Sequence, residues 1–337
     1  MTLSERIEVL GQLGDHLLGK DEYLEAVMKR TAFHNGWFTE DNQQEAVREI
    51  ALQMLNRDRL QEWLSRYELT ENSPKKVGIV MAGNIPLVGF HDWLCVFVAG
   101  HRAQVKLSEK DPFLFPYLMK ILERLDERTL AYTEVTDRLN GFDAVIATGS
   151  NNSARYFEAY FSKYPHIIRK NRNGVAVLTG DETPAELQEL GKDIFRYYGL
   201  GCRNVAKLYV PEGYDFDPLL EALHEYREVV LNTKYKNNFD YNYALFILNK
   251  IEFKANGCIL LVQDPALQSR IACLHYESYS SLEEVAKELQ ERESEVQCTV
   301  AKSGVLPIPA FNFGKAQEPA LWDYPDGEDT LAFLARL

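Results

Sequence analysis

The chain has 337 residues, of which 46% are hydrophobic and 26% charged, as in a soluble globular protein long enough for two domains. Its 37 basic and 50 acidic side chains give a net charge of -13. This charge argues against a nucleic-acid partner, because phosphate binding needs a basic face. No apolar run approaches the roughly 20 residues that span a bilayer, and the N-terminus lacks a signal-peptide core. We therefore expect a cytoplasmic protein with no transmembrane segment.

The first 70 residues are predicted to be helical and to carry no chemistry. Thr2-x-x-Glu5 is a capping-box pattern that opens one helix, and a second helix is expected from about Asp41. The second helix has apolar residues at the spacing of one buried face: Val47, Ile50, Ala51, Met54 and Leu55.

Short apolar strands and helices alternate from Val77 onward. Strands are predicted at 77–81, 103–106 and 144–148, with helices reaching about 100 and covering 112–125. This alternation predicts an α/β fold with a parallel sheet, and such sheets bind ligands at the carboxyl ends of their strands. Two of these ends carry glycine-containing polar turns, around Gly83-Asn84 and Gly149-Ser150. Neither turn matches G-x-G-x-x-G, so an ordinary dinucleotide fingerprint is absent.

Cys202 is predicted to be a nucleophile. It follows Gly199 and Gly201, which permit a sharp turn and close approach of a substrate, and it precedes a buried-looking strand. A thiol presented in this way can attack an acyl carbon and hold it as a thioester. No Cys-x-x-Cys pair is present, so neither a disulfide framework nor a metal site is predicted. The other four cysteines lie in apolar runs and are expected to be buried fillers: Cys95, Cys258, Cys273 and Cys298.

Five segments, in order and approximate spacing, resemble the aldehyde dehydrogenase superfamily. They are Ala82–Pro86, Ala99-Gly100, Val105–Glu109, Ala147–Ser150 and Gly201-Cys202. Within the superfamily the chain is most similar to the LuxC-type acyl-CoA reductases, which reduce long-chain acyl thioesters to fatty aldehydes. The segments that carry this second resemblance are Gly149–Phe157, Ile168–Arg172, Val296–Cys298, Phe313–Gln317 and Asp323–Thr330.

The resemblance implies roles for individual residues. Cys202 would accept the acyl group, and Asn84 would form an oxyanion hole with the backbone N–H of Cys202. Lys106 and Ser108, with Glu109, would meet the adenosine ribose of NADPH, although NADH stays open. The nicotinamide and pyrophosphate would lie beside three further residues: Gly149, Ser150 and Ser153.

A missing carboxylate indicates the direction of the reaction. Oxidative members of the superfamily carry a Glu that activates the hydrolytic water, whereas the corresponding region here, Ile168–Val175, has no carboxylate. Without that base an acyl-enzyme is not easily hydrolysed, which favours reduction of acyl-CoA or another acyl thioester. A second family carboxylate, which holds the nicotinamide ribose, has no clear match near Gln268–Arg270. Two alternatives stay open: an oxidative NAD(P)-dependent aldehyde dehydrogenase, and a non-catalytic nucleotide-binding partner protein.

Basic residues and histidines give weaker signals. Arg169, Lys170 and Arg172 either contact phosphates of CoA or NADPH or form a solvated strand entry. His91 and His224 either relay a proton or are structural, and the structural interpretation is favoured.

The predicted organisation has four parts. An N-terminal helical region (1–75) is followed by a nucleotide-binding domain (76–185) and a catalytic domain (186–310), and a C-terminal segment (311–337) returns across the cleft. In the catalytic domain, strands are expected near 259–262, 272–279 and 297–301, and helices from about Asp217 and over 282–289. Whether the chain forms a homo-oligomer stays open.

Overall fold

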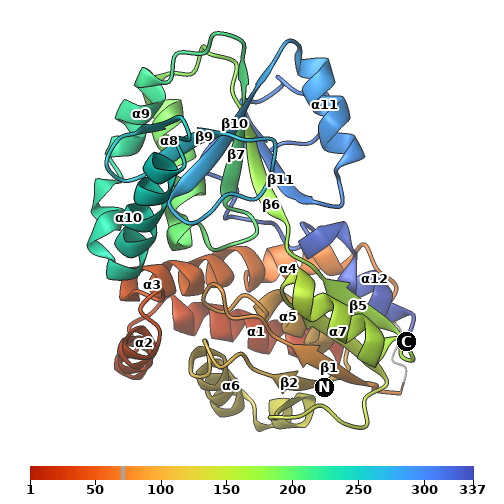
Figure 1. Ribbon diagram of the computed structural model, residues 1–337. Helices are drawn as coiled ribbons and strands as arrows, with labels where there is room; N and C mark the ends of the chain where they lie inside the picture. The colour runs from red at the N-terminus through yellow and green to blue at the C-terminus, as the bar shows by residue number, and fades with distance from the viewer. Residues whose placement is uncertain (70–72) are drawn as a thin grey trace. The chain divides into compact units, whose positions relative to one another are not determined.

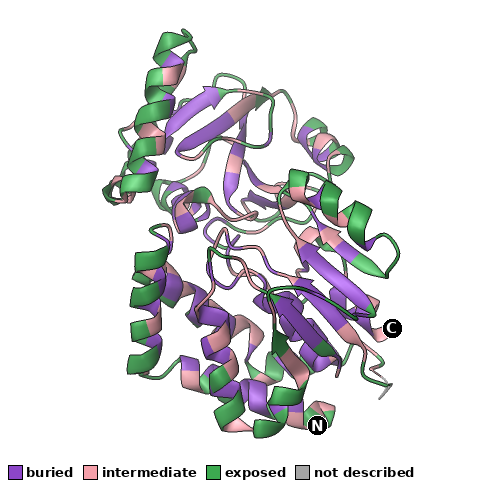
Figure 2. Ribbon diagram, turned by 60° about the horizontal axis from the view of Figure 1, so that its bottom comes forward, coloured by how far each residue is buried: buried purple, intermediate pink, exposed green. Residues whose placement is uncertain are grey.

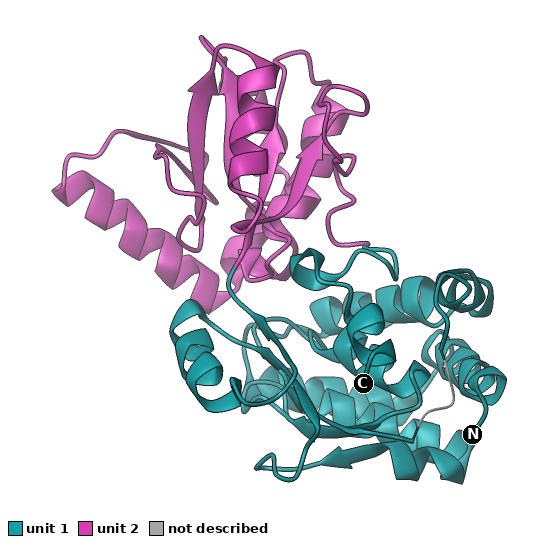
Figure 3. Ribbon diagram, turned by 90° about the vertical axis from the view of Figure 1, so that its right-hand side faces the viewer, with its two compact units in different colours: residues 1–171, 319–337 teal, residues 172–318 magenta. Residues whose placement is uncertain are grey.

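The structure, a computed structural model, describes residues 1–69 and 73–337 and divides into two compact units (Figure 3). Unit 1 comprises Met1–Asn171 and Pro319–Leu337, and unit 2 comprises Arg172–Glu318. The expected boundary after residue 185 therefore differs from the observed one, which follows Asn171. The reason is that β6 (Asn173–Val177) pairs with strands of the second sheet. The N-terminal helices belong to the same unit as the first sheet.

Unit 1 is built on a five-stranded parallel sheet of order β3-β2-β1-β4-β5 (Figure 1). The prediction of parallel βαβ units is confirmed. The sheet is parallel because a helix follows each of three strands and returns the chain to the starting edge. Its strands are β1 (Lys76–Val80), β2 (Arg102–Lys106), β3 (Thr133–Val135), β4 (Ala144–Thr148) and β5 (His166–Arg169), and its helices are α5 (Phe90–Val98), α6 (Leu114–Leu125) and α7 (Asn151–Phe161).

The N-terminal helices of unit 1 begin at capping residues. The predicted capping box is confirmed: the Thr2 side chain accepts from the backbone of Glu5, and the Glu5 carboxylate accepts from the backbone of Thr2. The second expected helix begins at Glu40, but another helix, capped by Asp21, precedes it. The helices of this region are α1 (Leu3–Leu17), α2 (Glu22–His34), α3 (Glu40–Glu49) with a π-helical turn (Ile50–Met54), and α4 (Arg57–Leu64); α12 (Thr330–Ala335) ends the chain.

Unit 2 contains a six-stranded sheet of order β11-β6-β7-β10-β9-β8, parallel except for β8. Its remaining strands are β7 (Val205–Pro211), β8 (Phe253–Ala255), β9 (Leu260–Gln263), β10 (Cys273–Tyr279) and β11 (Val296–Ala301), and its helices are α8 (Pro184–Phe195), α9 (Asp217–His224), α10 (Thr233–Leu248) and α11 (Leu282–Glu291). The strands and helices predicted for this region are confirmed, whereas α10 and the short strand β8 were not predicted. The sequence pattern of α10 explains why it was missed. Its periodicity is hidden because apolar residues occupy both its buried and its exposed sides, as buried Phe246 and exposed Leu248 illustrate. Figure 2 shows how buried and exposed residues are distributed along the helices. Among the helices of the described residues, none has the length and apolar character to cross a bilayer.

Candidate active site

The carboxyl ends of three neighbouring strands meet at one edge of the unit 1 sheet. Strand β1 lies between β2 and β4, and all three run parallel. The turn of Asn84 therefore lies between Lys106, at the end of β2, and Gly149, which follows β4. The chain order reverses between β1 and β4, and such a switch point is where ligands bind to open parallel sheets.

The turn of Asn84 packs directly on the segment that contains Ser108. A Cβ added to Gly83 would lie 2.5 Å from the Ser108 hydroxyl oxygen, so the glycine permits this close approach. Just before it, the backbone N–H of Met81 donates to the carbonyl of Lys106 over 3.0 Å. The structure thus brings together two predicted site segments that are separated by more than twenty positions in the sequence.

A buried carboxylate, Asp111, fixes the shape of the Asn84 turn. Leu87 has a φ of +56°, which is unfavourable for a non-glycine residue, and its N–H donates to Asp111 Oδ2 over 2.9 Å. Burial raises the pKa of Asp111 to about 6, although backbone donors from Leu87 and Leu114 oppose the shift. Sequence reasoning missed Asp111, and its position between Ser108-Glu109-Lys110 and a proline was the signal that could have found it.

The third turn at this edge begins α7. The Ser150 hydroxyl oxygen accepts from the backbone N–H of Ser153 over 3.2 Å and lies 3.1 Å from the Ser153 hydroxyl. A Cβ on Gly149 would lie 2.8 Å from Ser153 Cβ, so this turn also requires a glycine. The unpaired N–H groups and the dipole at a helix N-terminus favour a phosphate there.

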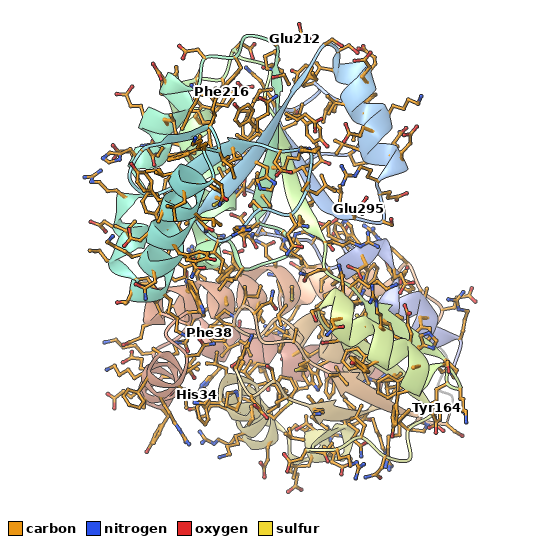
Figure 4. All side chains as sticks on the ribbon, viewed as in Figure 1. His34, Phe38, Tyr164, Glu212, Phe216 and Glu295 are labelled. Carbon is orange, nitrogen blue, oxygen red and sulfur yellow. The ribbon has the colours of Figure 1, made fainter. Side chains whose placement is uncertain are left out.

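Helix α2 supports the loop that carries the predicted ribose contacts. The His34 imidazole (Figure 4) lies 2.7 Å from the carbonyl oxygen of Glu109, and the Asn35 amide donates to the carbonyl of Lys110 over 3.2 Å. Lys106 and Glu109 are exposed. No chemistry was predicted for the N-terminal region, but two of its residues hydrogen-bond to a loop of the candidate site and so help to position that loop.

The basic residues of segment 169–172 differ in burial and in their partners. Arg169 is buried, and its guanidinium donates to Asp92 over 2.8 Å and to Thr330 Oγ1 over 2.7 Å. This corrects the expectation for Arg169: it is neither a phosphate contact nor a solvated residue, because its charge is taken up inside unit 1. Lys170 is exposed and pairs with Glu158 at 2.8 Å, and Arg172 in unit 2 donates to a backbone carbonyl over 3.0 Å.

Cys202 differs from the other cysteines in its exposure. It is half-buried in the turn between the 3-10 segment Arg196–Gly199 and β7, whereas the other four are buried, as predicted. Burial raises the pKa of Cys258 to about 11 and that of Cys273 to about 12, and it raises the pKa of Cys95 well above its usual value. These three thiols stay protonated at neutral pH and are poor nucleophiles.

Three consecutive residues before Cys202 have left-handed backbone angles. Their φ values are 53° for Tyr197, 58° for Tyr198 and 74° for Gly199. The sequence predicted the glycine turn but not the two tyrosines, which adopt this conformation at a cost of about 1–3 kcal/mol each. The side chain of Asn204 bonds to both ends of this loop: its Nδ2 donates to the carbonyl of Arg196 over 2.8 Å, and its Oδ1 accepts from Gly201 N over 2.8 Å.

The segment around Gly314 packs against the Cys202 turn within unit 2. Buried Asp193, at the end of α8, accepts from Gly314 N over 2.6 Å and from Ala316 N over 2.9 Å. Arg203 Nε donates to the carbonyl of Ala316 over 2.6 Å. Desolvation raises the pKa of Asp193 to about 6. The predicted segment Phe313–Gln317 therefore belongs to the support of the cysteine turn.

The two histidines make structural contacts. His91 is buried with Nε2 at 2.9 Å from the carbonyl oxygen of Leu321, and His224 has Nδ1 at 2.9 Å from that of Asn256. Across residues 1–69 and 73–337, no group of three or more His, Cys, Asp or Glu side chains is placed to hold a metal ion.

Comparison with known proteins identifies the fold. No family model matches the sequence, and no curated protein sequence matches it significantly. Solved structures do match. Aldehyde dehydrogenase 21 from Physcomitrella patens, in complex with succinate, aligns with a TM-score of 0.70 at 13% identity over 100% of this chain and 84% of that one. An NADP-dependent enzyme of E. coli aligns with a TM-score of 0.69 at 13% identity, over 93% and 78%.

An NAD-dependent aldehyde dehydrogenase from Sinorhizobium meliloti aligns with a TM-score of 0.66 at 13% identity, over 90% of this chain and 71% of that one. The chain therefore has the aldehyde dehydrogenase fold, with a Rossmann-like unit and a second α/β unit, as the sequence predicted.

Proposed function

We propose that the chain is a nicotinamide-dependent oxidoreductase of aldehyde or acyl groups, and specifically an NADPH-dependent reductase of fatty acyl-CoA thioesters. The observation that carries the proposal is the half-buried Cys202 in a glycine-containing turn, in a chain whose other cysteines are buried. The fold supports nucleotide binding in unit 1, and the nicotinamide cofactors named for similar structures support the cofactor class. NADPH rather than NADH, and CoA as the carrier, rest on the LuxC-type resemblance.

The proposed reaction begins with attack of the Cys202 thiolate on the thioester carbon. The bond to the CoA sulfur breaks, CoA leaves as a thiolate that takes a proton from water, and the acyl group stays on Cys202. When bound, NADPH would supply the hydride that reduces the acyl group on Cys202 to the thiohemiacetal level. Return of the electron pair to Cys202 then releases the aldehyde. The Asn84 amide and the Cys202 N–H are proposed to stabilise the oxyanion formed in each step.

The nucleotide is proposed to bind at the carboxyl edge of the unit 1 sheet. Lys106 and Ser108 would hold the adenosine ribose and a 2′-phosphate, with Glu109 beside them. The pyrophosphate would bind at the N-terminus of α7, beside Ser150 and Ser153. Gly149 has no side chain, so the pyrophosphate could approach the backbone there. The close packing of Gly83 on Ser108 supports this arrangement because it draws the ribose segment to the Asn84 turn.

The test is intact mass spectrometry after mixing the protein with acyl-CoAs of increasing chain length. We expect a mass increase equal to one acyl group in the wild type and in the buried-cysteine control Cys273→Ala, and none in Cys202→Ala. Addition of NADPH should remove the adduct and release free aldehyde.

Two other results would replace the proposal. Conversion of an aldehyde and NADP to a free acid, without consumption of acyl-CoA, would identify an oxidative aldehyde dehydrogenase. Failure of Cys202 to take label from radioactive acyl-CoA, with nucleotide binding retained, would indicate a non-catalytic partner protein.

A further inference from the structure

Asn204 is a buried amide whose side-chain hydrogen bonds go to the end of α8 and to the loop that carries Cys202. Its side chain is 2% exposed. The Nδ2 group donates to the carbonyl of Asp193 over 2.9 Å and to that of Arg196 over 2.8 Å, and Oδ1 accepts from Gly201 N over 2.8 Å. One side chain thus ties the end of α8 to the residue directly before Cys202.

The backbone of Asn204 fixes the peptide that contains the Cys202 N–H. The Asn204 N–H donates to the Gly201 carbonyl over 3.1 Å. In a planar trans peptide the carbonyl and the following N–H point in opposite directions. Fixing the Gly201 carbonyl therefore also fixes the direction of the Cys202 N–H, which is the proposed backbone donor to the oxyanion.

The loop needs such a constraint because its conformation is costly. Tyr197 and Tyr198 hold left-handed angles that persist only where surrounding contacts enforce them. Asn204 bonds to both ends of this segment, at Arg196 and at Gly201. Its loss would leave buried backbone groups unpaired and let the strained loop relax.

We infer that Asn204 is a positioning residue for acyl transfer: its side-chain amide ties Arg196 and the Gly201 N–H to the end of α8. This bracing holds the turn in which the Asn204 backbone N–H fixes the Gly201–Cys202 peptide, so the Cys202 N–H and thiol keep the reactive orientation. This inference rests on the proposed function for its catalytic meaning. The geometry itself can be tested without any substrate, through the reactivity of the Cys202 thiol.

The experiment compares Asn204→Ala with Asn242→Ala. Asn242, on α10, is a matched control because it is an asparagine of unit 2 that is also 2% exposed. Its Nδ2 donates to the carbonyl of Ile271 over 2.9 Å. In each full-length variant, iodoacetamide labelling of Cys202 is followed by peptide mass spectrometry as a function of pH. Acyl transfer from acyl-CoA is followed in parallel, as kcat and KM.

We expect Asn204→Ala to lower kcat for acyl transfer at least 10-fold, with the Kd for NADPH unchanged. The rate of Cys202 labelling should change at least threefold at one or more of the pH values measured. Asn242→Ala should match the wild type in both measurements. Labelling and acyl-transfer rates within twofold of the wild type in Asn204→Ala would overturn the inference.

A second variant covers a failure to fold. Asn204→Asp keeps the acceptor for Gly201 N but replaces the donors by a carboxyl oxygen that faces the carbonyls of Asp193 and Arg196, so the labelling rate should change at least threefold. If Asn204→Ala does not fold, wild-type labelling in Asn204→Asp would overturn the role of the donors, whereas a threefold change would support it. If no variant forms an acyl adduct, the proposed function fails, and the labelling rates still decide the role of Asn204.

Discussion

The turn of Asn84 in unit 1 and the turn of Cys202 in unit 2 are both strained, but different chemistry holds them. Asp111, a buried carboxylate with a raised pKa, bonds the left-handed Leu87 of the first turn. Asn204, a buried neutral amide, spans the second. Because a carboxylate titrates and an amide does not, substitution of Asp111 should change the pH dependence of stability, whereas substitution of Asn204 removes no titrating group.

The largest expected effect on stability concerns a pair of arginines that lie on either side of the boundary between the units. Arg169→Met leaves the buried Asp92 without its partner and should lower the free energy of unfolding by about 3–5 kcal/mol. Arg172→Met, on the unit 2 side, should change it by less than about 1 kcal/mol. Urea unfolding measures both values. Equal effects would contradict the assignment of Arg169 to the core of unit 1.

Asn84→Ala tests the catalytic half of the first turn. Loss of one oxyanion donor is expected to remove about 2.7–4 kcal/mol of transition-state stabilisation, a 10²–10³-fold slower acylation of Cys202. The Kd for NADPH should stay the same, because the amide is not a proposed nucleotide contact. Stopped-flow kinetics measure the acylation rate, and NADPH fluorescence titration measures the Kd. If acylation and NADPH binding both weaken, the turn has collapsed and the amide is not shown to be an oxyanion donor.

Asp111→Asn tests the pH response of the first turn. The folded carboxyl has a pKa of about 6 against 3.8 in its ordinary state, so the folded protein binds more protons between these values and loses stability as pH rises through them. The asparagine variant should therefore gain stability relative to the wild type, by on the order of 2–3 kcal/mol from pH 4 to pH 7. Urea unfolding at several pH values measures this difference.

A matched comparison sharpens that test. In Asn204→Ala the difference in unfolding free energy from the wild type should stay constant over the same pH range, since no titrating group is removed. A pH-dependent difference in this variant would contradict the prediction and would indicate that loss of the amide shifts the pKa of Asp193, the buried carboxylate of the residue to which Asn204 donates.

The smallest effect is expected for Lys170→Ala. Its ion pair with Glu158 is exposed on both sides, so unfolding free energy should change by at most about 1 kcal/mol. If Lys170 contacts a phosphate rather than forming a solvated strand entry, the Kd of the Lys170→Ala variant for acyl-CoA or NADPH should rise about fivefold, in a salt-dependent way. An unchanged Kd would leave Arg172 alone as the predicted phosphate contact of this segment.

Sequence alone determined the parts of the protein that depend on local patterns. Strands such as β4 are short apolar runs, and Thr2 and Glu5 define a helix start, so both could be predicted from neighbouring residues. Gly199, three residues before Cys202, marked the turn because its left-handed conformation is one that few other residues adopt. The fold followed from the order of such segments.

Only the tertiary structure decided what holds the turns and which charges are buried. Asp111 and Asn204 act through partners that local periodicity does not reveal, and Arg169 looked like a surface residue until Asp92 and Thr330, far away in the sequence, were found beside it. A buried polar group is stable only when its partners are in place, and those partners come from distant segments that the fold brings together.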